Sequence, residues 1–241
     1  MKKIFLLSII IIFFLSCGIE DYVFLPPVPQ GNVSTTFNSG ATIALPSFDV
    51  TEFRYFRNFT IYYRIYISGI SYPVVNEENM RDLNPSLSTH YGDFRRIIES
   101  DTPTTSSMGR LFNDRNYYSL TVENASIEDI LSSRAMGKTI TINFLSTNPQ
   151  TIPHLVIDGQ RYNLRRSNGG GLFRPVPEDR YFFNRSELYS SENMDVASNA
   201  NATGERYTYV SMYIVSSGID SNFSPVYSLP AFINVFMLPN P

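Results

Sequence analysis

Two histidines, His90 and His154, are the only imidazole groups of the 241-residue chain. They lie 64 residues apart, and neither has a second histidine at the spacing of metal ligands. A serine nucleophile would need one of them as its base, yet the sequence holds no G-x-S-x-G elbow. We therefore expect structural or solvated roles for both histidines, with no metal and no cofactor.

Carboxylates could carry a different chemistry. Glu123 with Glu128, or Glu178 with Asp179, could serve as the acid pair of a glycan hydrolase. The separation of two such carboxyl groups in space decides whether they can act together, and a sequence does not give this distance.

Two further motifs point to ion or phosphate binding only weakly. Asn113, Asp114 and Asn116 offer oxygen atoms to calcium without the alternation and the glycine of an EF-hand loop. Gly169-Gly170-Gly171 is followed by Leu-Phe-Arg-Pro and not by the Gly-Lys-Ser/Thr of a phosphate-binding loop. We interpret the three glycines as the flexible tip of a hairpin or lid.

Cys17 is the only cysteine, and a distinctive N-terminal segment precedes it. Lys2 and Lys3 come before the apolar residues 4–15, a run within the length of a secretory signal. This run is shorter than the roughly 20 apolar residues that span a bilayer. We predict a signal peptide over residues 1–16.

The residues Phe14-Leu15-Ser16-Cys17 resemble the lipobox of bacterial lipoproteins, in the looser form found in spirochaetes. This resemblance implies that Cys17 is acylated and that the lipid attaches the protein to a membrane. It also implies a location in the bacterial cell envelope, either periplasmic or surface-exposed. An acylated Cys17 would leave the mature chain without a thiol for a disulfide, a nucleophile or a metal site.

The charge of the mature chain bears on its partners. Without Lys2 and Lys3 the chain has 19 − 2 = 17 basic residues against 22 acidic ones, a formal charge of −5. We expect no nucleic-acid partner, because phosphate binding requires positive charge. All the mature basic residues except Lys138 are arginines, and the whole chain also has 16 tyrosines and 18 phenylalanines. Arginine beside aromatic residues suits a protein or glycan partner.

Residues 17–31 form a proline-rich segment between the cysteine and the rest of the chain. We predict an extended tether here, which could hold a domain up to roughly 40 Å from the membrane. The alternative is an edge strand that begins after Pro29. The remaining residues, 32–241, would form one domain.

The clearest predicted strand covers residues 58–70. Its alternation places Phe59, Ile61, Tyr63, Ile65 and Ile67 on a core-facing side. The opposite side carries Tyr62, Arg64 and Tyr66, which we expect to face outward. Such a ladder is either cross-strand packing on a sheet surface or a binding face.

A second alternating strand covers residues 206–216. We predict that Val210, Met212 and Ile214 face the core and that Tyr207, Tyr209 and Tyr213 face away from it. After it, Gly218 opens a turn, and Ser224-Pro225 leads into a last strand that ends at Leu238.

The middle of the chain, about residues 76–200, mixes helix and strand signals. We predict a helix over residues 85–99, and a short helix that Ser126 caps and Gly137 ends. Strands are expected over residues 117–122 and 139–145, and Asp158-Gly159 predicts a two-residue hairpin turn.

Residues 33–70 and 204–238 resemble fibronectin type III and related immunoglobulin-like domains, whose last two strands pair around a tyrosine-rich strand, a glycine-containing turn and a Ser-Pro step. The resemblance implies a mainly β fold. The expected architecture is an antiparallel immunoglobulin-like or fibronectin III-like sandwich with a partly helical insertion at about residues 76–200. Another sandwich topology remains the alternative.

These observations predict a lipid-anchored cell-envelope protein that acts as a non-catalytic binding or structural module. Arginine and aromatic residues are enriched at interface hot spots, so the expected binding face combines residues of both predicted strands. These residues are Tyr62, Arg64, Tyr66, Tyr207, Tyr209 and Tyr213. The alternatives are a carboxylate-dependent glycan hydrolase, or a small-ligand carrier with a pocket between helix 85–99 and the sheet.

Overall fold

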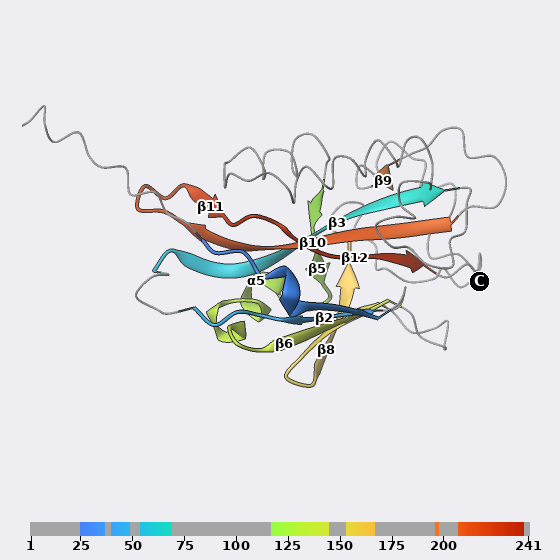
Figure 1. Cartoon of the computed structure of the whole chain (residues 1–241), viewed down its shortest axis with the longest axis horizontal. Helices are drawn as coiled ribbons and strands as arrows, with labels where there is room; N and C mark the ends of the chain where they lie inside the picture. Colours follow the sequence, from blue (N-terminus) through green and yellow to red (C-terminus); the bar gives the residue numbers. More distant parts are fainter. Residues whose placement is uncertain are drawn as a thin grey trace, which may run out of the picture.

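The computed structural model describes residues 25–36, 40–48, 54–68, 117–144, 153–166, 196–197 and 207–238. In this part of the chain the fold is mainly β, with two sheets that pack face to face (Figure 1). The predicted helix over residues 85–99 lies outside the described residues, as do His90 and Cys17.

The first sheet has the strand order β1-β2-β6-β7-β8-β5, and all its pairings are antiparallel. Its strands are β1 (Val33–Thr36), β2 (Gly40–Ala44), β5 (Thr121–Val122), β6 (Thr139–Asn143), β7 (His154–Ile157) and β8 (Gln160–Arg165). Asp158 and Gly159 link β7 to β8 with φ angles of 51° and 76°, as the predicted two-residue turn requires.

The second sheet is built on two long antiparallel strands, β3 (Phe56–Ser68) and β10 (Tyr207–Ile219). Two strands pair with the free edge of β10, namely β11 (Pro225–Tyr227) and β12 (Ala231–Leu238). On the other side, β3 pairs with β4 (Tyr118–Ser119) and, in parallel, with β9 (Val196–Ala197). The predicted final strand is therefore two strands, and Gly218 lies within β10 while the turn follows at residues 220–224.

The strand order follows that of an immunoglobulin-like sandwich. The pairings β1-β2-β6 and β3-β10-β12 match the A-B-E and C-F-G orders of such folds. Beyond these three strands, the first sheet continues with the β7–β8 hairpin, which lies between β6 and β5. The prediction of a mainly β antiparallel sandwich is thus confirmed.

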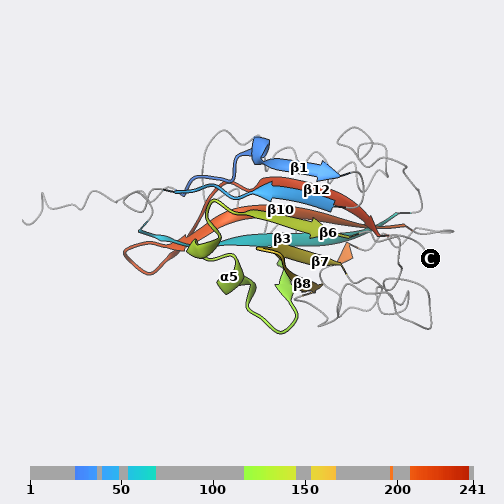
Figure 2. The ribbon, with the colours of Figure 1, turned by 90° about the horizontal axis from the view of Figure 1, so that it is seen from below.

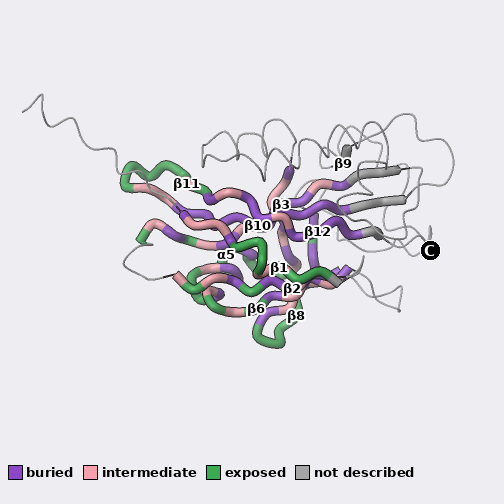
Figure 3. Tube along the Cα trace, viewed as in Figure 1, coloured by how far each residue is buried: buried purple, intermediate pink, exposed green. Residues whose placement is uncertain are grey.

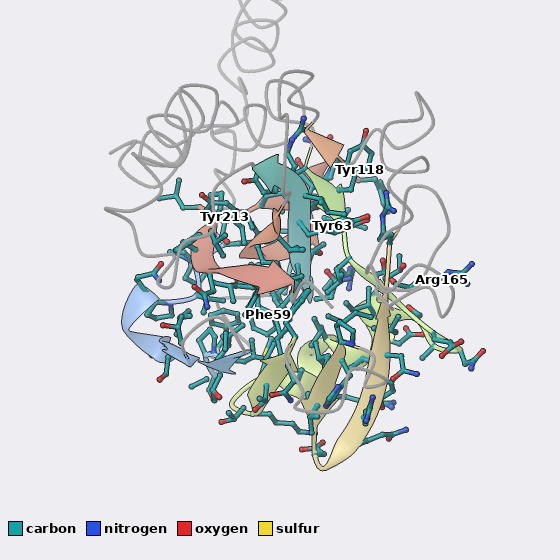
Figure 4. The ribbon with its side chains drawn as sticks, turned by 90° about the vertical axis from the view of Figure 1, so that its right-hand side faces the viewer. Phe59, Tyr63, Tyr118, Arg165 and Tyr213 are labelled. Carbon is teal, nitrogen blue, oxygen red and sulfur yellow. The ribbon has the colours of Figure 1, made fainter. Side chains whose placement is uncertain are left out.

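The core lies between the sheets, where the alternation of β3 and β10 places their apolar residues. Phe59, Ile61, Tyr63 and Ile65 are buried, as predicted, and so are Val210, Met212 and Ile214. Figure 4 shows Phe59 and Tyr63 extending from β3 into the space between the sheets. The same hydrophobic cluster includes residues of the first sheet, namely Ile43, Ile140, Ile142 and Leu155.

A short helical segment closes one side of the core. Helix α5 (Ile127–Ile130) begins after Ser126, whose hydroxyl oxygen accepts a hydrogen bond from the backbone N–H of Asp129 at 3.2 Å. A 3₁₀ turn, η3 (Ser133–Ala135), follows, and Gly137 ends the segment with a φ angle of 71°. The predicted cap and the predicted terminal glycine are both confirmed.

The two sheets are joined at both edges. At one edge, the chain passes from β4 in the second sheet to β5 in the first, with the buried Leu120 between them. At the other edge, β1 lies beside β12 (Figure 2). There the side-chain amide of Gln30, in the 3₁₀ turn η1 (Gln30–Asn32), donates to the carbonyl of Phe232 at 2.8 Å and accepts from its N–H at 3.2 Å.

Residues 25–31, predicted to belong to the tether, pack on the sandwich instead. Leu25 and Val28 are buried in the core, and the hydroxyl of Ser216 donates to the carbonyl of Pro26 at 2.8 Å. The prolines do not keep this segment away from the domain, because the adjacent Leu25 and Val28 bury apolar surface against it. Among the described residues, no helix is long and apolar enough to cross a membrane.

Candidate functional site

The tyrosine and arginine residues of the predicted binding face all belong to the two paired strands β3 and β10 of the second sheet. The backbone register sets Tyr213 opposite Tyr62, Ser211 opposite Arg64, and Tyr209 opposite Tyr66. By alternation, Tyr62, Arg64, Ser211 and Tyr213 lie on the side of β3 and β10 that faces away from the first sheet. Tyr207 is paired with Ser68 in the backbone register.

This side of the second sheet is buried where its side chains are described. Tyr62 is 5% exposed and Tyr213 is 0% exposed, while Arg64 is half-buried. The expectation that Tyr62 and Tyr213 form an open ladder is therefore wrong. The side chains of Tyr66, Tyr207 and Tyr209 lie outside the described part of the structure.

Contacts between aromatic rings explain part of this burial. The ring of Tyr117 meets that of Tyr213 edge-on, with centroids 5.4 Å apart and an interplanar angle of 79°. The Tyr117 and Ser211 hydroxyls are 3.1 Å apart, and Phe232 of β12 lies 5.4 Å from the Tyr213 ring. We call Tyr62, Tyr117, Ser211, Tyr213 and Phe232 the outer aromatic layer, a second packed layer behind the main core.

The environment of Tyr62 keeps its phenol neutral. Burial raises the pKa of Tyr62 above the ordinary tyrosine value, and the negative charges that Tyr227 and Glu128 can carry raise it further. The burial that causes this shift is typical of a packing residue, not of a side chain that meets a partner in solvent.

The opposite surface of the sandwich is different. On the side of the first sheet that faces away from the core, one row of neighbouring residues runs across β2, β6, β7 and β8, and a second row runs across β6, β7 and β8. None of these side chains is buried. We call them the outer polar face, and they are Thr42, Thr141, Val156 and Arg161 in one row and Asn143, His154 and Asn163 in the other.

Side chains of the outer polar face interact with one another. The Asn143 amide nitrogen lies 3.4 Å from Nε2 of His154, its cross-strand partner. The amide of Asn163 donates a 3.0 Å hydrogen bond to a carboxylate oxygen of Glu123. The face therefore presents hydroxyl, amide, imidazole and guanidinium groups on one sheet. Figure 4 shows Arg165, the last residue of β8, pointing away from the sandwich near this face.

The candidate carboxylates have separate local contacts. Glu123 accepts the hydrogen bond from Asn163, whereas a Glu128 oxygen accepts one from the Ser126 hydroxyl at 2.9 Å at the start of α5. Within the described ranges, no cluster of three or more histidine, cysteine or acidic side chains could hold a metal ion. The remaining candidates all lie outside the described residues, namely Asn113, Asp114, Asn116, Gly169–Gly171, Glu178 and Asp179.

Comparisons with known proteins add no assignment. No protein-family model matches the chain, and searches of curated proteins and of solved structures found no match either.

The burial of the outer aromatic layer does have a signal in the sequence. In β10, residues 210–215 read Val-Ser-Met-Tyr-Ile-Val, with apolar or aromatic side chains on both sides of the strand. A near-continuous run of this kind is typical of a strand covered on both faces. By contrast, β6 reads Thr-Ile-Thr-Ile-Asn, the strict alternation of a strand with one open face.

Proposed function

We propose that this chain is a lipid-anchored, non-catalytic module of a bacterial cell envelope. The observation that carries the proposal is the position of the only cysteine, directly after a charged start and a short apolar run, in a sequence that resembles a lipobox. Acylation of Cys17 would attach the sandwich to a membrane.

The packing of Leu25 determines how close to the membrane the sandwich would lie. Only eight steps of chain separate Cys17 from Leu25, the first described residue, which is buried in the core. Even a fully extended chain of this length spans at most about 28 Å. The module would thus lie nearer the bilayer than the roughly 40 Å that a free tether up to residue 31 allows.

The outer polar face is the surface that best suits a partner. Thr42, Thr141 and His154 remain accessible on a sheet side that offers many hydrogen-bond donors and acceptors. Glycan hydroxyls and polar protein surfaces both satisfy such groups. We therefore move the proposed interaction surface from the outer aromatic layer to the outer polar face, with a protein or a glycan as partner.

Neither alternative function gains support from the described residues. The contacts of Glu123 and Glu128 do not unite them into an acid pair. The glycan hydrolase would otherwise use Glu178 and Asp179, and the small-ligand carrier would use helix 85–99. All these residues lie outside the described part of the chain.

Metabolic labelling tests the anchor. Bacteria that express the chain should incorporate labelled fatty acid into it, and Cys17→Ser should abolish the label and leave the uncleaved precursor. A matched control combines Cys17→Ser with Ser221→Cys, which places a thiol at an exposed turn and should also remain unlabelled. Undiminished labelling of Cys17→Ser would refute the proposed anchor.

A further inference from the structure

The β10–β11 hairpin carries the two exposed large apolar side chains of the described residues. Phe223 is 88% exposed and Tyr227 is 38% exposed. Single exposed apolar residues are common on protein surfaces. These two, however, belong to one hairpin at one end of the sandwich, where Figure 3 shows an exposed turn beside the buried strand β10.

The turn holds Phe223 outward through a defined network. The backbone N–H groups of Asn222 and Ser224 both donate to the Asp220 carboxylate at 2.8 Å, and the Phe223 N–H donates to the Asp220 carbonyl at 3.1 Å. Phe223 has a φ angle of 62°. Glycine is the residue that adopts such a left-handed conformation most readily. Here a bulky aromatic residue occupies it and buries almost nothing against the domain.

The chain from Cys17 enters the sandwich at this same end. Leu25 lies against Gly218, so closely that a Cβ atom on that glycine would be 3.1 Å from the leucine side chain. Gly218 is two residues before Asp220, where the turn begins. The opposite end of β10, at Tyr207, is about 36 Å away at the rise of a β-strand. The hairpin tip is therefore at the end of β10 nearest to Leu25, where the chain from Cys17 enters the sandwich.

A positive charge lies beside the tip. The Ile219 N–H donates to the carbonyl of Tyr55 at 3.0 Å, which fixes the Arg54–Tyr55 turn next to the hairpin. The guanidinium carbon of Arg54, an exposed residue, lies 4.6 Å from the centroid of the Tyr55 ring. An exposed arginine stacked over an aromatic ring suits the phosphate level of a bilayer.

We propose that this tip, formed by Phe223, Tyr227 and Arg54, is a second contact with the lipid bilayer. Phe223 enters the boundary between head groups and acyl chains, while Arg54 faces the lipid phosphates. The inference rests on the proposed anchor at Cys17. Because this anchor would keep the tip at a high effective concentration next to the membrane, a contact of small area would be enough for the tip to bind the bilayer. The contact would orient the sandwich with its β10–β11 end toward the bilayer.

The chain contains no tryptophan, so the environment of the tip can be measured through the fluorescence of a single introduced tryptophan. Phe223→Trp introduces a single fluorescent reporter, and Gln160→Trp places a control reporter on the exposed start of β8. The processed chain, residues 17–241, contains every described element and one thiol. Coupling Cys17 to a maleimide lipid attaches it to phosphatidylcholine and phosphatidylglycerol vesicles, with or without brominated acyl chains.

The expected result is blue-shifted emission of Trp at position 223 and quenching by the brominated chains, with neither effect at position 160. The same emission wavelength at positions 223 and 160, with no quenching at either, would overturn the inference. This result would also cover the case in which the tip binds a protein instead of the bilayer. Tyr227→Trp is a second reporter, expected to shift in the same direction if Phe223→Trp fails to fold. The chemical coupling does not depend on acylation in cells, so a failed tip and a failed anchor give different results.

Discussion

In both sheets the side chains alternate between the core and an outer face, but the two outer faces differ in how far their side chains are buried. On the second sheet, Tyr62 and Tyr213 are buried in the outer aromatic layer, although they face away from the main core. On the first sheet, Thr141 and Val156 remain accessible at equivalent central positions. The comparison shows that alternation identifies which side chains share a face, whereas the composition of both faces indicates whether each is covered.

This difference changes which surface is available to a partner. Tyrosine and arginine are common at interfaces, but a tyrosine with no exposed surface stabilises the domain instead. The outer polar face carries fewer aromatic groups and more accessible hydrogen-bonding groups. We therefore expect substitutions on the two faces to affect different properties, stability in one case and recognition in the other.

The largest expected effect is that of Tyr213→Ala. Removal of a fully buried aromatic ring that contacts Tyr117 and Phe232 should lower the free energy of unfolding by about 3–5 kcal/mol. Denaturant unfolding measures the change, and Tyr227→Ala, at an exposed tyrosine, is the matched control with an expected loss below about 1 kcal/mol. Similar small losses for both variants would mean that the outer aromatic layer contributes no packing.

A smaller effect is expected on the first sheet, at two consecutive residues of β7. Val156→Ala, on the outer polar face, should lower the free energy of unfolding by about 1 kcal/mol or less. Leu155→Ala, on the buried side, should cost about 2–5 kcal/mol because it leaves a cavity in the core. The same unfolding experiment compares them, and a reversed order would show that β7 turns its other side to the core.

Features that depend on neighbouring residues in sequence were predictable. The alternation of β3 identified the core positions Phe59 to Ile65 because a one-residue shift would move all of them to the other face of the sheet. The Asp158-Gly159 turn and the Ser126 cap were also predictable, since each needs only local backbone geometry and one or two side-chain types.

Features that depend on distant segments were not predictable in the same way. Leu25 and Val28 are adjacent to prolines, and their burial depends on β10, about 190 residues later, whose Ser216 hydroxyl donates a hydrogen bond to the Pro26 carbonyl. The burial of Tyr213 depends on Tyr117, which lies just before β4 in the middle of the chain. No local pattern specifies such contacts, although the apolar residues on both sides of β10 indicate that its second face is covered.

The central claim, that the outer tyrosines of the second sheet are a buried layer and not an open binding face, can be tested by tyrosine nitration. Tetranitromethane reacts with accessible phenolates, so burial and the raised pKa of Tyr62 should both protect that residue. Mass spectrometry of peptides from the native protein should find nitration at Tyr227, with Tyr62 and Tyr213 modified only after unfolding. Native-state modification of Tyr62 and Tyr213 as fast as that of Tyr227 would contradict the account.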